Sequence, residues 1–267
     1  MRKSTRFLKR HIISSDTHAF VGRIFDLSVI AYHFETYDEL CKFKDAKYAF
    51  DVNQWISLLV RRVESLNGIS DMLWLTKEAM AIDTWPISRF DWLNVCVDAF
   101  LMRIVSVIDG ALILTNEVYE VGLDEKRCSI SNLRKADISP NVIGSLALIS
   151  DELTHLKEER NYRFHRGVER SLSSDDDAFR FAALLEHRGG GKITGTDKHG
   201  NKVNSSVYFK EGLVELQRDF NVSARKLERA LRNLYDHLHL EFEARFHIKY
   251  NDADTSFGFR TRAQSLA

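Results

Sequence analysis

The sequence predicts a mainly α-helical protein: a helical bundle with a small β-hairpin insert and an extra helical region at the N-terminus. The chain of 267 residues contains only 2 prolines, the residue that most strongly interrupts helices. Apolar residues also recur at spacings of three and four along most of the chain, which is the pattern of one helical face. We therefore expect at least about 55% helix, with strand confined to about residues 190–210.

The N-terminal part of the chain shows this spacing in two stretches, residues 17–34 and 46–66. Gly68 is expected to end the second helix, and Ser70 and Asp71 are suitable caps for a third. Trp85-Pro86 then interrupts the pattern. We place a boundary near residues 85–90, which separates an N-terminal helical region, 1–87, from a helical bundle, 88–250.

The bundle opens with a long predicted helix that Ser88 or Asp91 would cap and Gly122 would end. A glycine-rich stretch farther along, 188–207, has two short β-prone segments on either side of Asp-Lys-His-Gly-Asn, which predicts a β-hairpin. A polar tail, 251–267, closes the chain. The predicted helices of the bundle cover residues 88–121, 141–160, 176–187 and 211–249.

Charge and cysteine content narrow the class of protein. Lys plus Arg and Asp plus Glu both number 38, a balance that excludes a polybasic nucleic-acid coat but allows a local basic site. The 3 cysteines are widely spaced and indicate reduced thiols. The most apolar run, residues 95–114, is interrupted by Asp98, Arg103 and Asp109 and makes a poor bilayer span. We expect a cytoplasmic protein without a membrane segment.

Two patterns that suggest a cofactor or a metal do not fit their chemistry. The glycine run at Arg188–Ile193 lacks the spacing and the Ser/Thr of a phosphate-binding loop. His237 and His239 are two residues apart, so on a regular helix they point in different directions and cannot share a metal ion. We expect the protein to use neither a cofactor nor a metal.

An Arg-Asn pair followed by a histidine four residues after the asparagine occurs twice. The copy at Arg232, Asn233 and His237 lies inside a long predicted helix, where residues five apart are about 140° apart around the axis. We interpret this copy as an exposed amphipathic face.

The other copy comprises Arg160, Asn161 and His165, and Arg166-Gly167 follows it as a helix-stop signal. A bend there is expected to bring Arg160 toward Asn161 and His165, which share a helical face at spacing four. Glu158 and Glu159 stand directly before it and are candidates to orient the arginine. A plain basic helix end, favoured by the helix dipole, is the alternative interpretation.

Arg160-Asn161-x-x-x-His165-Arg166-Gly167, after a helix and within a helical region, resembles the motif of the HEPN superfamily. The resemblance covers roughly residues 90–249 and implies an up-and-down bundle of four or five helices. Many HEPN proteins are metal-independent endoribonucleases of toxin–antitoxin, CRISPR and anti-phage systems, whereas others only bind or scaffold. The hairpin insert and the N-terminal region depart from the family pattern.

The chemistry of RNA cleavage suits the three side chains. His165 can exchange protons near neutral pH, Arg160 can bind two phosphate oxygens at once, and Asn161 can orient the imidazole or contact the phosphate. The reaction has two proton transfers, and a twofold dimer supplies the second histidine; the resemblance implies the same arrangement. We therefore expect an endoribonuclease that leaves 2′,3′-cyclic phosphate and 5′-OH ends. Its expected partners are RNA, a second copy and an antitoxin or other regulatory protein, and the alternative is an inactive HEPN-like binding module.

Overall fold

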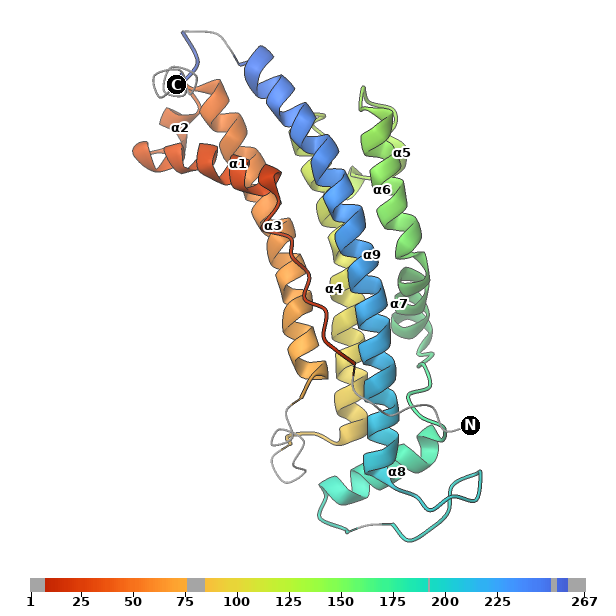
Figure 1. Cartoon of the computed structure of the whole chain (residues 1–267). Helices are drawn as coiled ribbons and strands as arrows, with labels where there is room; N and C mark the ends of the chain where they lie inside the picture. The colour runs from red at the N-terminus through yellow and green to blue at the C-terminus, as the bar shows by residue number, and fades with distance from the viewer. Residues whose placement is uncertain (1–7, 76–84, 192, 251–253, 259–267) are drawn as a thin grey trace. The chain divides into compact units, whose positions relative to one another are not determined.

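The computed structural model describes residues 8–75, 85–191, 193–250 and 254–258. Of these residues, 71% lie in helices, as the apolar spacing predicts. Figure 1 shows the helices in chain order. They are α1 (Ala19–Ser28), the short 3-10 helix η1 (Val29–His33), α2 (Tyr37–Leu40), α3 (Lys44–Leu73), α4 (Arg89–Val118), η3 (Glu125–Arg127), α5 (Ile130–Leu133), α6 (Pro140–Glu152), α7 (Thr154–Arg166), α8 (Asp176–His187) and α9 (Ser205–Ile248).

The chain forms two compact units that alternate along the sequence. The first comprises residues 1–13, 65–105 and 153–226, and the second comprises the rest. Helices α3, α4 and α9 each contribute to both units, so the units do not coincide with the segments 1–87 and 88–250. Whether those two segments are separate domains stays a prediction.

The core of the first unit is built around aromatic side chains of α9. Phe220 is fully buried and packs against Trp74 and Phe100, with ring centroids 5.8 and 5.7 Å away. Tyr208 packs in the same way against Phe179 of α8 at 5.9 Å. Aromatic rings each bury a large apolar area, so these contacts hold α9 to α4 and α8 within this unit.

Two buried amides of α9 bind the extended N-terminal segment. Gln217 accepts a hydrogen bond from the backbone N–H of Leu8, and Asn221 accepts one from His11 and donates one to the carbonyl of Lys9. Buried amides need such partners, because an unpaired polar group in a core is costly. This explains two polar residues on the inward face of a helix.

The second unit packs around Phe242 of α9. Its ring lies 5.1 Å from Tyr48 of α3 and 6.0 Å from Phe20 of α1. The hydroxyl of Tyr48 donates to the carbonyl of Val118 at the end of α4, 2.7 Å away. The apolar faces predicted in residues 17–34 and 46–66 thus meet the C-terminal half of α9.

The prediction for the long helix at 88–121 is confirmed. Ser88 lies directly before α4, and its Oγ accepts a hydrogen bond from the N–H of Asp91 at 3.1 Å. The helix ends at Val118, a few residues before the expected stop: Glu120 is already left-handed at φ 50°, and Gly122 follows at φ 74°. Serine caps and left-handed glycines commonly lie at helix ends. They therefore predict both ends of α4 to within a few residues.

Gly68, in contrast, does not end a helix. Helix α3 continues through it to Leu73, so Ser70 and Asp71 do not begin a new one. A glycine inside a helix costs only about 1 kcal/mol, and packing of the neighbouring apolar residues Leu66 and Ile69 outweighs that cost. The remainder of the predicted third helix, 76–82, lies outside the described residues.

The predicted hairpin insert is not seen. Within the described part of 188–207, pairing is limited to an isolated antiparallel bridge between Thr196 and Lys202. The carboxylate of Asp197 accepts hydrogen bonds from the backbone N–H groups of His199 and Asn201 and from the hydroxyl of Tyr208. The carboxylate thus holds residues 197–201 in a turn. The second β-prone segment forms no strand because α9 begins at Ser205, where the side chain of Asn204 accepts hydrogen bonds from the N–H groups of Ser206 and Val207.

Candidate functional site

The Arg-Asn-His motif lies inside helix α7. The helix predicted over 141–160 is interrupted at Leu153, whose backbone leaves the helical region at φ −106° and ψ 3°, and α7 then begins at Thr154. The motif was expected to follow a helix and to contain a bend. It is instead helical throughout, and Gly167, at φ 65°, ends the helix one residue beyond it. The stop signal is therefore confirmed, but the bend is not found.

The helical conformation decides how the three motif residues face. His165 is exposed, and Asn161 and Arg160 are half-buried. Asn161 and His165, four residues apart, share the outward face as predicted. Arg160 and His165 are five apart and about 140° apart around the axis. The structure does not bring them together within one chain.

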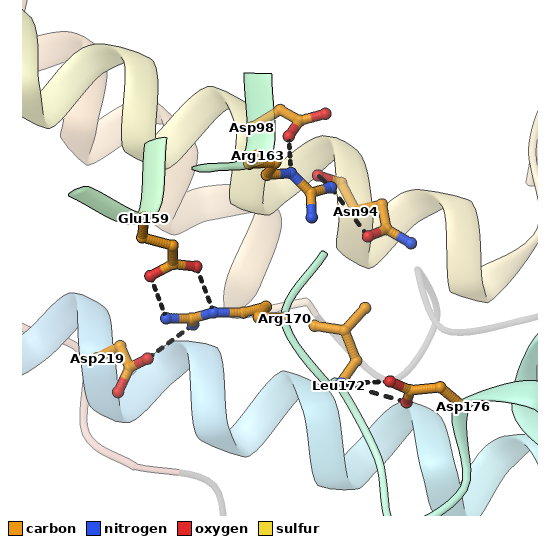
Figure 2. Close-up of polar contacts among 8 residues, drawn as sticks. All are labelled: Asn94, Asp98, Glu159, Arg163, Arg170, Leu172, Asp176 and Asp219. Atoms are coloured by element: carbon orange, nitrogen blue, oxygen red, sulfur yellow. Dashed lines mark hydrogen bonds and ion pairs between the residues drawn. The ribbon is translucent and has the colours of Figure 1, made fainter. Parts of the chain in front are cut away.

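The residue of this stretch that faces inward is Arg163, which the sequence interpretation left without a role. Its side chain is only 6% exposed and forms an ion pair with Asp98 of α4. A second nitrogen of the same guanidinium donates to Oδ1 of Asn94 at 2.9 Å (Figure 2). One signal in the sequence pointed to this pair: Asp98 interrupts the most apolar run of the chain, where a charge needs a partner.

A second neutralised arginine stands after the end of α7. Arg170 forms ion pairs with Glu159 at 2.6 Å and with Asp219 of α9 at 2.7 Å (Figure 2). Burial alone lowers the pKa of this guanidinium, and the contacts with the two carboxylates more than offset that effect and raise it. Glu159, a candidate to orient Arg160, is therefore engaged with Arg170.

Arg160 differs from these two arginines. Its Nε is buried and, like Nη1 of Arg163, has no hydrogen-bond partner among the residues that the structure describes. In that part of the chain no carboxylate pairs with it, whereas Arg163 and Arg170 each contact at least one. A guanidinium without an internal counter-ion retains its capacity to bind an external anion, and a phosphate is the group that its planar fork fits best.

The second copy of the motif lies in the middle of α9. Arg232 is 62% exposed and stands 3.7 Å from Glu228, one turn earlier in the same helix. Asn233 donates a hydrogen bond to Ser145 of α6 at 2.8 Å, and His237 is half-buried. Arg232 and Asn233 are exposed, as the interpretation of an exposed amphipathic face expects, whereas His237 is half-buried and Asn233 also links α9 to α6.

Two further findings concern metals and membranes. Among residues 8–75, 85–191, 193–250 and 254–258, no group of three or more His, Cys, Asp or Glu side chains is placed to hold a metal ion. No helix in these ranges combines the length and the apolar character that a bilayer span requires.

Comparison with known proteins gives no relative: the chain matches no family model, no curated protein and no solved structure.

Proposed function

We propose that this protein is a metal-independent endoribonuclease of the HEPN type, in which Arg160, Asn161 and His165 act on RNA. The observation that carries the proposal is the contrast among three neighbouring arginines. Arg163 and Arg170 are neutralised by carboxylates, whereas Arg160 has no such partner in the described structure and lies on the helix that exposes His165. Cleavage of RNA by its own 2′-OH can use an imidazole for proton transfer and a guanidinium to stabilise the charge on the phosphate.

The proposed reaction uses the nucleophile that RNA already carries. His165 takes the proton of the ribose 2′-OH, and the resulting oxygen attacks the adjacent phosphorus. The bond from phosphorus to the 5′-oxygen breaks, and that oxygen receives a proton from a second imidazole. Arg160 stabilises the charge on the pentacovalent phosphate, and the products carry a 2′,3′-cyclic phosphate and a 5′-OH.

The orientation of the motif makes a second copy of the chain necessary. Because Arg160 and His165 point in directions about 140° apart, the helix by itself does not aim both side chains at one point beside it. A twofold axis beside α7 would bring His165 of both copies to one phosphate and so supply the second imidazole, and the long Arg160 side chains would reach the same phosphate from its flanks. In this proposal the bundle has the up-and-down topology of the family and pairs near residues 88–121 and 141–165.

We predict a homodimer in solution. Light scattering coupled to size-exclusion chromatography measures the mass directly. A thiol-reactive cross-linker should join two copies of the Asn161→Cys protein if their α7 helices face each other. The wild-type chain, treated with the same cross-linker, controls for its three native cysteines. A strictly monomeric protein that cleaves RNA at full rate would contradict the composite site.

The activity itself is tested by incubating the purified protein with total cellular RNA in the presence of EDTA. We expect fragments to accumulate at the same rate with and without the chelator, because every proposed catalytic group is a side chain of the protein. The proposed setting is phage defence, a toxin or a stress response, in which an antitoxin or another regulatory protein would restrain the activity. Cleavage that needs added Mg²⁺ would overturn this mechanism.

A second candidate function is a catalytically inactive HEPN-like module that binds nucleic acid or protein. The observation in its favour is that α7 stays helical through the motif, so that no single chain assembles a site. The two candidates differ in one result. The inactive module binds RNA but leaves it intact, whereas the nuclease degrades it.

A further inference from the structure

One side of α7 carries an exposed aromatic residue between the two chemical groups of the proposed site. Phe164 stands four residues after Arg160 and directly before His165, and it is 47% exposed. On a helix it therefore lies about 40° from Arg160 and about 100° from His165, within the arc that separates them. Lys157, Asn161 and Phe164 follow one another at spacings of four and three, so they lie on the same arc.

We propose that Phe164 is a base-stacking residue, which restricts the substrate to RNA whose bases are unpaired at the cleavage position. The inference rests on the proposed function, because it assumes that Arg160 and His165 act on RNA. Side chains at spacing four have Cβ atoms about 5–6 Å apart, which is close to the separation of a phosphate from the base of the same nucleotide. A phosphate held by Arg160 thus places a base beside the ring of Phe164.

The surroundings of Phe164 fit RNA better than an apolar protein surface. The arc holds the cations Lys157 and Arg160 together with the imidazole of His165, and positive groups interleaved with an aromatic ring are typical of sites for single-stranded nucleic acid. The neighbouring carboxylate of Glu158 lies two helical turns from His165, at the edge of the arc. A base inside a duplex is stacked on its neighbours and cannot reach a flat helix surface.

Tyr162 provides a matched comparison on the same helix. This residue is also 47% exposed, but it lies on the opposite side of α7 from Phe164. The guanidinium of Arg166 already covers its ring, 4.7 Å from the centroid. Two aromatic residues of equal exposure thus differ in the side of α7 that they occupy and in whether a cation already covers the ring.

The test measures binding, so that it does not depend on catalysis. A fluorescein-labelled single-stranded RNA of mixed sequence is titrated with the His165→Ala protein and with the same protein carrying Phe164→Ala, Phe164→Trp or Tyr162→Ala. Loss of a base-stacking aromatic typically weakens binding about 5- to 150-fold, so we expect a loss in this range for Phe164→Ala. Phe164→Trp should keep affinity within about threefold, since indole also stacks, and Tyr162→Ala should leave it unchanged.

Two further measurements complete the experiment. Each variant is also titrated against the same RNA annealed to its complement, and the mass of each variant is measured to determine its oligomeric state. The proposal requires that Phe164→Ala weaken binding of the single strand while it leaves the weaker binding of the duplex unaltered. An unchanged affinity for the single strand overturns it, as does an equal loss on both RNAs. A Phe164→Ala protein that becomes monomeric also overturns it and assigns the ring to the contact between copies. If Phe164→Ala weakens binding but the wild-type protein leaves RNA intact, the stacking site stands and the nuclease proposal fails.

Discussion

Replacing His165 with alanine is expected to abolish RNA cleavage and leave the fold intact. The imidazole is exposed on α7, so its loss removes no core packing. A general acid or base contributes about 10²–10⁴ in rate, and in a symmetric dimer the substitution removes both proton-transfer groups at once. The measurement is the initial rate of RNA cleavage, together with a circular dichroism melt to confirm the unchanged fold.

Two further variants test the other parts of the proposed site. Arg160→Ala should lower the rate about 10²- to 10³-fold, because the guanidinium stabilises the charge that develops on the phosphate. His237→Ala is the matched control, since it belongs to the same local pattern in the interior of α9, and it should retain nearly full activity. An active His165→Ala protein beside an inactive His237→Ala protein would assign catalysis to the other copy of the motif.

The second large effect is expected on stability. Asp98→Ala leaves the buried guanidinium of Arg163 without its carboxylate, and breaking a buried ion pair typically costs about 3–5 kcal/mol. Because the side chain of Asp98 is itself 41% exposed and water reaches it, we expect about 2–3 kcal/mol. Urea unfolding followed by circular dichroism measures the loss.

Two controls isolate the ion pair from other effects of the substitution. Asp109→Ala removes another carboxylate of α4, an exposed one, and should change the free energy of unfolding by less than about 0.5 kcal/mol. The double variant Asp98→Leu with Arg163→Met replaces the pair with apolar side chains of similar size, and it should recover much of the loss. If the double variant loses as much free energy of unfolding as the Asp98→Leu and Arg163→Met single variants lose together, the two residues are not coupled.

Local patterns predicted those parts of the fold that local forces decide. The apolar spacing located the long helix at Arg89–Val118, and the identities of Ser88, Gly122 and Gly167 marked helix boundaries that the structure shows. Each of these features depends on residues within one or two turns of each other. A sequence displays such features directly.

The features that the sequence did not reveal depend on distant partners. Helix α3 continues through Gly68 because Leu66 and Ile69, which precede and follow it, are buried, and their packing outweighs the low helix propensity of glycine.

The candidate site likewise has features that local spacing predicts and features that depend on residues far away in the chain. The shared face of Asn161 and His165 follows from their spacing alone, and the structure has it as predicted. The role of Arg163 depends on Asp98, which is 65 residues away in the chain and adjacent only after folding. The bend expected between Arg160 and His165 is absent, so in the proposed site the two residues need a second copy of the chain to act together.

The ends of the cleaved RNA test the proposed chemistry most directly. A single RNA of known sequence is digested in EDTA, and the fragments are weighed by mass spectrometry. Attack by the 2′-OH predicts fragments that end in a 2′,3′-cyclic phosphate and begin with a 5′-OH, and it predicts that the same RNA with 2′-deoxyribose at the cleaved positions stays intact. Fragments with 3′-OH and 5′-phosphate ends, or cleavage of the 2′-deoxy substrate, would contradict the mechanism.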